Sequence, residues 1–231
     1  MDFFVNKFFL LAITFGFFFL SKLLQKKTGW VLLNPILVAI AMLICFLQFT
    51  GVSYETYSEA GSLVEFWLKP AVVALGVPLY LQLRMIKKQL MPILISQLAG
   101  CVVGLISVTI IAKLMGASPE VIMSLAPKSV TTPIAMEVSN AVGGIPSLTA
   151  AVVIVVGLFG AICGFKLLQV GRVASPIAQG LSMGTAGHAV GTSRAMEVSG
   201  KYGAYASLGL TLNGILTALL SPTILHILGL Y

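Results

Sequence analysis

The chain has 231 residues, of which 58% are hydrophobic and 9% are charged. A soluble domain carries about 25% charged residues, so this composition excludes a soluble enzyme and a nucleic-acid-binding domain. The net charge of +7 is instead typical of membrane proteins, whose cytoplasmic loops collect Lys and Arg. Neither a catalytic dyad nor a metal-ligand cluster is visible in the sequence. We therefore expect a membrane protein without enzymatic activity, cofactor or metal.

Six long apolar segments predict transmembrane helices. They cover residues 3–24, 30–49, 63–83, 90–115, 144–168 and 202–230. Each is long enough to cross a hydrocarbon core of about 30 Å at about 1.5 Å per residue. The sequence therefore predicts an all-α polytopic membrane protein with one membrane domain over residues 1–231.

The basic residues predict the orientation of these segments. Three lysines at 22–27 follow the first segment and three basic residues at 84–88 follow the third, whereas the loop between the second and third segments contains glutamates. Because Lys and Arg are enriched in cytoplasmic loops, we expect residues 84–88 to lie inside. Both termini are then predicted to be periplasmic.

Two further segments, residues 118–143 and 175–200, predict discontinuous helices. Each opens with Ser-Pro, which is typical of a helix start, and each is interrupted by polar or small residues. At an offset of 60 residues, positions 124–148 and 184–208 share eleven identities in twenty-five. The match indicates an internal repeat, with N-terminal helices at 1–117, a first copy at 118–174 and a second copy at 175–231.

The loop between the two copies predicts how the repeat lies in the membrane. Lys166 and Arg172 place this loop inside. The first broken segment then enters and leaves on the outer side, and the second on the inner side, as two re-entrant hairpins of an inverted repeat. The alternative is eight fully spanning segments.

The interruptions of the two broken segments are candidate anion sites. Thr132, before Pro133, is predicted to cap a second half-helix in the first copy, and Thr192 or Ser193 in the second. A helix amino terminus offers unpaired N–H groups to an anion, and each interruption adds hydroxyls and a basic side chain. The candidate substrate-binding residues are Lys128, Ser129, Thr131, Thr132, His188, Thr192, Ser193 and Arg194. The alternative is that these polar groups satisfy the backbone and that Lys128 or Arg194 reaches an interface.

Glu137 and Glu197 occupy equivalent positions of the repeat, about one turn into each second half-helix. A carboxylate in hydrocarbon has to be protonated or paired. The two glutamates either neutralise Lys128 and Arg194 or bind a coupling proton or cation. Asn34 and Asn213 are further candidates for substrate contact within apolar segments.

Four motifs of the chain resemble the LrgB/CidB family. They are Leu33-Asn34-Pro35, the stretch 68–75, and the two interruptions at 126–133 and 187–195. The resemblance covers nearly the whole chain. It implies a bacterial inner-membrane protein that assembles as a homo- or hetero-oligomer with a smaller, holin-like LrgA/CidA-type membrane protein.

The resemblance leaves two functions open. A plastidal glycolate and glycerate transporter resembles a fusion of the LrgB- and LrgA-type proteins, which implies secondary transport of small monocarboxylates such as glycolate, glycerate or pyruvate. The alternative is a holin-like or antiholin-type regulator of murein hydrolase activity and lysis. Paired basic residues at membrane depth favour transport of a small organic anion.

Overall fold

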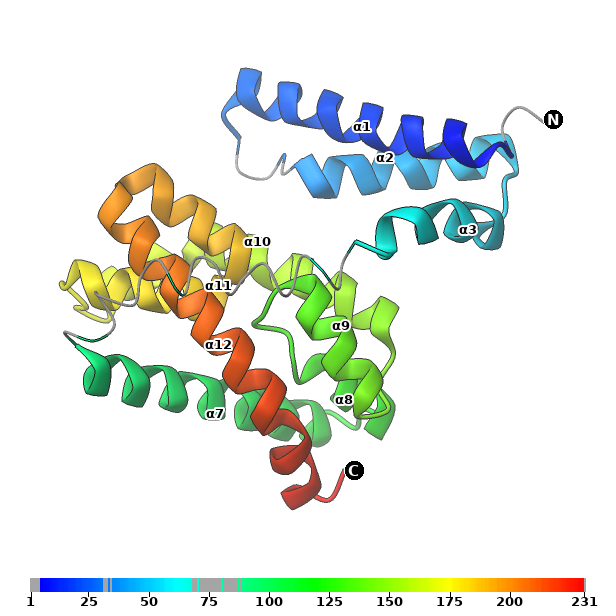
Figure 1. Ribbon diagram of the computed structural model, residues 1–231. Helices are drawn as coiled ribbons and strands as arrows, with labels where there is room; N and C mark the ends of the chain where they lie inside the picture. Colours follow the sequence, from blue (N-terminus) through cyan, green and yellow to red (C-terminus); the bar gives the residue numbers. More distant parts are fainter. Residues whose placement is uncertain are drawn as a thin grey trace. The chain divides into compact units, whose positions relative to one another are not determined.

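The computed structural model describes residues 5–30, 33, 35–67, 70, 80, 87 and 89–230 of the chain (Figure 1). The described residues form helices joined by turns, without a strand. The chain divides into two compact units, Met1–Ala71 and Val72–Tyr231. Each unit is described by itself below.

The first unit contains α1 (Lys7–Thr28), α2 (Pro35–Thr50) and α3 (Tyr54–Glu65). The Asn6 side chain caps α1 by accepting from the N–H groups of Phe8 and Phe9, and Gly29 ends the helix at φ 67°. Helix α1 packs on α2.

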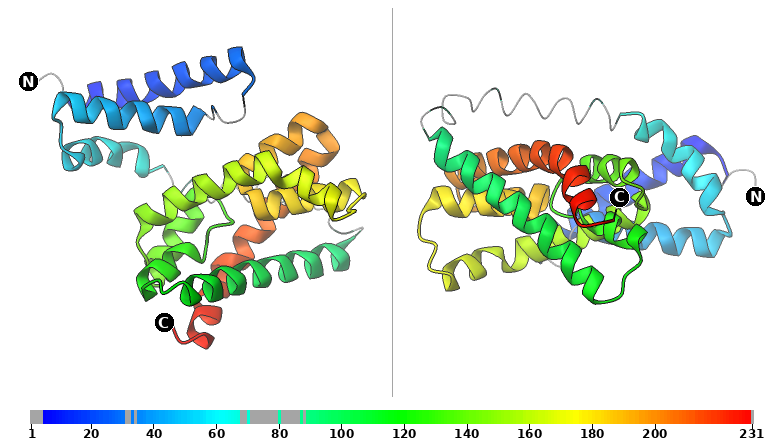
Figure 2. Two further views of the ribbon diagram at one scale, coloured as in Figure 1. Left: turned by 180° about the vertical axis from the view of Figure 1, so that it is seen from behind. Right: turned by 90° about the horizontal axis from the view of Figure 1, so that it is seen from below.

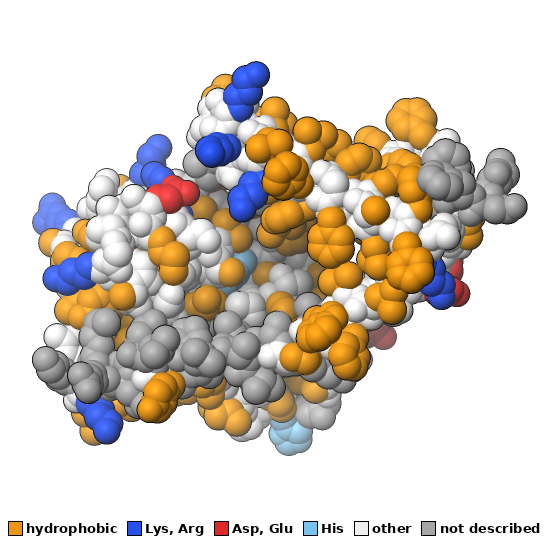
Figure 3. Space-filling view, turned by 45° about the horizontal axis from the view of Figure 1, so that its top comes forward, with side chains coloured by type: hydrophobic (Ala, Val, Ile, Leu, Met, Phe, Trp, Pro, Cys, Tyr) orange, Lys and Arg blue, Asp and Glu red, His pale blue; other side chains and the backbone are white. Residues whose placement is uncertain are grey.

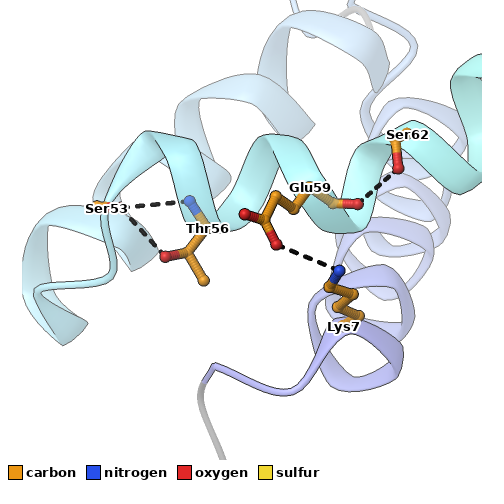
Figure 4. A network of polar contacts seen from close by, with 5 residues as sticks. All are labelled: Lys7, Ser53, Thr56, Glu59 and Ser62. Carbon is orange, nitrogen blue, oxygen red and sulfur yellow. Dashed lines mark hydrogen bonds and ion pairs between the residues drawn. The ribbon is translucent and has the colours of Figure 1, made fainter.

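Polar contacts hold α3 on α1 (Figure 4). Lys7 Nζ lies 3.2 Å from Glu59 Oε2, and the hydroxyls of Thr14 and Tyr57 are 3.0 Å apart. Sequence reasoning treated this stretch as a loop, but Ser53 accepts from the Thr56 N–H and starts a helix there. The missed signal is the Ser cap ahead of Glu55 in the first turn.

The second unit contains three long helices, α7 (Leu90–Leu114), α10 (Pro146–Val170) and α12 (Gly200–Ile227). Together with α1 they are the four helices of the described residues that are long and apolar enough to cross a membrane. Helix α2 is apolar but shorter, and most of the predicted segment 63–83 lies outside the described residues. The class of polytopic helical membrane protein is confirmed. Figure 3 shows hydrophobic side chains over much of the described surface.

The first broken segment folds back on itself. It consists of α8 (Pro119–Leu125), an interruption at 126–131 and α9 (Thr132–Ala141). Where the chain returns, the Ile145 N–H donates to Ser124 Oγ at 2.7 Å and the Thr149 hydroxyl donates to the Ser124 carbonyl at 2.9 Å. The interruption, which we call the first tip, reaches the middle of α7. The segment is therefore a helical hairpin.

The cap of α9 differs by one residue from the prediction. Thr131 is the N-cap and Thr132 the first helical residue, so Pro133 occupies the second helical position. Proline is tolerated throughout the first helical turn because the N–H groups there lack intrahelical partners.

The second broken segment, α11 (Pro176–Val198), also reverses. His188 has φ 40° and ψ −134°, which interrupts the helix; we call residues 186–189 the second tip. The second half returns along the first, where Gly191 lies against the Met183 carbonyl and Ala195 packs with Met183. The prediction of Thr192 or Ser193 as a cap is wrong, because the reversal occurs four residues before Thr192 and both residues lie inside the second half-helix.

The two hairpins lie at opposite ends of α10 (Figures 1 and 2). The first precedes its amino end and the second follows its carboxyl end. Helix α12 starts beside the first half of α11, where a Cβ on Gly180 would lie 2.8 Å from the Tyr202 carbonyl oxygen. The carboxyl ends of α7 and α12 lie together, since Lys113 Nζ donates to the Leu228 carbonyl. Two hairpins entering a bilayer from opposite faces remain a prediction.

Candidate functional site

Asn213, in the middle of α12, connects the two hairpins. Its side-chain nitrogen donates to the Ser129 carbonyl of the first tip at 2.9 Å and to the Thr185 carbonyl, just before the second tip, at 3.1 Å. The residue is 1% exposed. Both acceptors are main-chain carbonyls, so the amide has to present its nitrogen to them. One side chain thereby joins the first tip to the first half of α11, one residue before the second tip.

A cavity of about 600 Å³ lies at this junction. It is bounded by α7, α11, α12 and the first tip, and extends from the amino end of α7 at Gln89 to Lys128. Its polar and small lining residues include Ser96, Gln97, Gly100, Gly104, Lys128, Ser129, Ser182, Thr185, Asn213 and Thr217. The cavity is large enough for a small organic molecule together with water.

Lys128 is the one charged residue among the described residues that line this cavity. Its Nζ contacts neutral groups, the Ser129 hydroxyl oxygen at 3.2 Å and the Gly104 carbonyl at 3.5 Å. In the described part of the chain no carboxylate lies within ion-pair distance of it. When it is protonated, a partly buried amine without a counter-charge attracts an anion.

The cavity also offers hydrogen-bonding atoms for a polar ligand. Asn213 Oδ1 is buried and has no partner in the described structure. Gln97, 2% exposed, accepts from the Thr185 hydroxyl at 2.7 Å through Oε1. A buried polar atom without a partner is costly, so the Asn213 oxygen favours a structure in which a donor reaches it.

The second tip contributes less to the cavity than predicted. His188 is 3% exposed, and its Nε2 lies 2.7 Å from the Val153 carbonyl on α10. The Ser193 hydroxyl donates to the Ala189 carbonyl at 3.0 Å. Thr192 is buried with its hydroxyl unpartnered, as is the Thr131 hydroxyl in the first tip, but neither residue lines the cavity. Of the predicted set, the structure thus places Lys128, Ser129 and Asn213 at one site.

The remaining charged candidates lie outside the cavity. Arg194 forms an ion pair with Glu197 one turn further along α11; the Glu197 side chain is largely exposed and that of Arg194 is partly exposed. This is the neutralising alternative that the sequence left open for Glu197. Glu137 is exposed on α9. Asn34 lies outside the described residues.

Sequence reasoning missed the contribution of α7. Gln97, Gly100 and Gly104 line the cavity from one face of this helix. A signal was present, because a glutamine followed by glycines at positions i+3 and i+7 forms a polar, small-residue stripe in an otherwise apolar segment.

Comparison with known proteins identifies the family. Residues 14–227 match the LrgB-like family. The chain is 37% identical over 216 residues to the holin-like protein CidB of Staphylococcus epidermidis, with 94% of each chain covered. It is 34% identical over 209 residues to the antiholin-like protein LrgB of Bacillus cereus, covering 90% of this chain and 91% of the relative. No solved structure matches the chain. The chain belongs to the LrgB family.

Proposed function

We propose that this protein is a secondary transporter of small monocarboxylates, bound in the cavity where the two hairpins meet. The observation that carries the proposal is Lys128, the one charged residue among the described lining residues, with neutral oxygens as its contacts. A carboxylate at this position supplies the missing counter-charge. The resemblance of a plastidal glycolate and glycerate transporter to a fusion of LrgB- and LrgA-type proteins supports the same class of substrate.

Alternating access follows from the hairpins. By the charge argument, the amino end of α7 and the loop at 171–175 face the cytoplasm. The cavity extends from Gln89 and Ser175 at that end to the first tip, which forms its floor. Movement of the hairpins against α7 and α12 then opens the floor to the opposite side.

A second candidate function is holin-like or antiholin-like control of lysis. It is favoured by the names of the relatives, which describe CidB proteins as holin-like and an LrgB protein as antiholin-like. In that case the protein acts through oligomeric pores or through contact with a smaller LrgA/CidA-type membrane partner. The names of the relatives support the holin-like function better than they support transport of a monocarboxylate. The transport proposal depends on the cavity.

A flux assay in proteoliposomes separates the two candidates. We expect saturable uptake of a radiolabelled monocarboxylate, strongly reduced in Lys128→Met. An ionic hydrogen bond is worth about 1.5–3 kcal/mol, so apparent affinity should fall by roughly tenfold or more. Lys201→Met, which removes an exposed charge at the start of α12, is the matched control and should transport normally.

Two results would contradict transport. One is non-saturable leakage of unrelated solutes and a trapped dye, which would favour the holin-like function. The other is equal monocarboxylate uptake by wild type and Lys128→Met, at equal amounts of inserted protein.

A further inference from the structure

We infer that Lys128 carries the coupling proton of transport, so that one proton and one anion bind and leave the cavity together. The inference rests on the proposed function. It places the coupling proton on Lys128 instead of on Glu137 or Glu197, for which the sequence left open either neutralisation of the basic residues or binding of a coupling ion.

The described residues of α7, α11 and α12 that line the cavity with Lys128 carry no charge. Helix α7 contributes the Gly104 carbonyl and Cys101, whose Sγ lies 3.4 Å from the Thr217 hydroxyl of α12. Helix α11 carries one titratable group near the cavity-lining residues, His188. Its ring points away from the cavity, to the Val153 carbonyl of α10. Asn213 and Thr217 on α12 are uncharged.

An ammonium ion with neutral partners alone is costly inside a membrane protein. In the empty cavity the neutral amine is therefore favoured. When the carboxylate anion enters, a proton from the solution binds to the lone pair of Nζ, and the resulting ammonium pairs with the anion. No bond in the substrate changes, and on release the proton and the anion both return to solution.

Binding of the two ions is then cooperative in both directions. If the anion raises the affinity of Nζ for a proton, a proton raises the affinity of the site for the anion by the same factor. In the loaded site the positive ammonium pairs with the negative carboxylate, and in the empty site the amine is neutral. Neither state brings an uncompensated charge to the hairpin junction.

The two glutamates lie outside the described lining of the cavity. Glu197 is paired with Arg194 and largely exposed, and Glu137 is exposed on α9. A proton on either carboxylate would be separated from the bound anion.

Lys128→Arg tests the inference because a guanidinium keeps the positive charge but cannot lose its proton in a protein. In proteoliposomes loaded with unlabelled monocarboxylate, this variant should still exchange labelled substrate. It should lose accumulation driven by an inward proton gradient. Glu137→Gln and Glu197→Gln are the controls, and both should retain exchange and accumulation.

Accumulation by Lys128→Arg at the wild-type level would overturn the inference, as would selective loss of accumulation in either glutamine variant. Exchange by the wild type without any response to a pH gradient would overturn it too, while leaving anion transport intact. Absence of saturable exchange in the wild type would remove the proposed function itself.

A second measurement does not depend on the folding of a variant. Purified wild-type protein is placed in weakly buffered detergent solution at alkaline pH. It should take up about one proton for each anion bound, because the amine is neutral in the empty site and becomes protonated when the anion binds. A pH electrode and titration with the sodium salt of the monocarboxylate measure this ratio. Anion binding without proton uptake would overturn the inference even if Lys128→Arg does not insert into the membrane.

Discussion

The two tips lie in segments whose sequences match at an offset of 60 residues, but their basic side chains point to different surroundings. The first directs Lys128 into the cavity, whereas the second directs His188 away from it, to the Val153 carbonyl on α10. The basic residue that follows the second tip, Arg194, is paired outside. The comparison teaches that the repeat preserves a hairpin and not a symmetric pair of charged groups. The chemistry of the site is assigned to the first tip, and the second tip is held against α10.

The largest expected effect on stability is at the contact between the second tip and α10. Gly157 on α10 faces it, and a Cβ there would lie 2.7 Å from His188 Nε2 and 2.9 Å from Val190 Cγ2. Gly157→Ala should therefore destabilise the protein by about 1–3 kcal/mol, as overpacking does. Thermal unfolding in detergent measures the change.

Gly104→Ala is the matched control beside the first tip. A Cβ at Gly104 would meet no atom of another element within 4 Å in the part of the chain that the structure describes, so this variant should unfold at or above the wild-type temperature. Equal unfolding temperatures for Gly157→Ala and wild type would mean that the second tip is not seated closely on α10.

A smaller effect is expected at the residue that joins the two tips. Asn213→Ala removes the donors to the Ser129 and Thr185 carbonyls. Side-chain hydrogen bonds in membrane proteins average about 0.6 kcal/mol, so the loss should be roughly 1 kcal/mol. Apparent affinity for the monocarboxylate should fall as well, because Asn213 lines the cavity and holds the first tip in place.

Asn140→Ala, at an exposed position on α9, controls for the loss of an asparagine amide. It should leave both stability and affinity unchanged. If the two variants behave alike, Asn213 does not join the tips in the functional protein.

The smallest effect is expected at Arg194. Its ion pair with Glu197 is largely exposed, and such pairs contribute about 0–1 kcal/mol. Arg194→Gln should therefore transport at nearly the wild-type rate, unlike Lys128→Met in the same flux assay. Loss of uptake as severe as that of Lys128→Met would restore the symmetric anion clamp that the sequence suggested and would break the comparison between the tips.

Several features of the fold could be predicted from the sequence because they depend on neighbouring residues. Apolar length identified α1, α7, α10 and α12 as candidate spans. The Ser-Pro pairs marked the starts of α8 and α11, with Ser118 and Ser175 as N-caps. Gly, Pro and polar residues marked both interruptions, although the caps after them were misplaced. Such signals are local, since a helix start or break is decided within about one turn.

The composition of the site was decided by tertiary structure. Identical Ala-Met-Glu-Val-Ser motifs follow both tips, and nothing in them indicates that Lys128 lines the cavity while Arg194 stays outside. The α10 backbone accepts His188 at Val153, and one amide on α12 reaches carbonyls 84 and 28 residues away in the chain. The direction of a side chain depends on which helix packs opposite it, and that is a property of the assembled bundle rather than of a local motif.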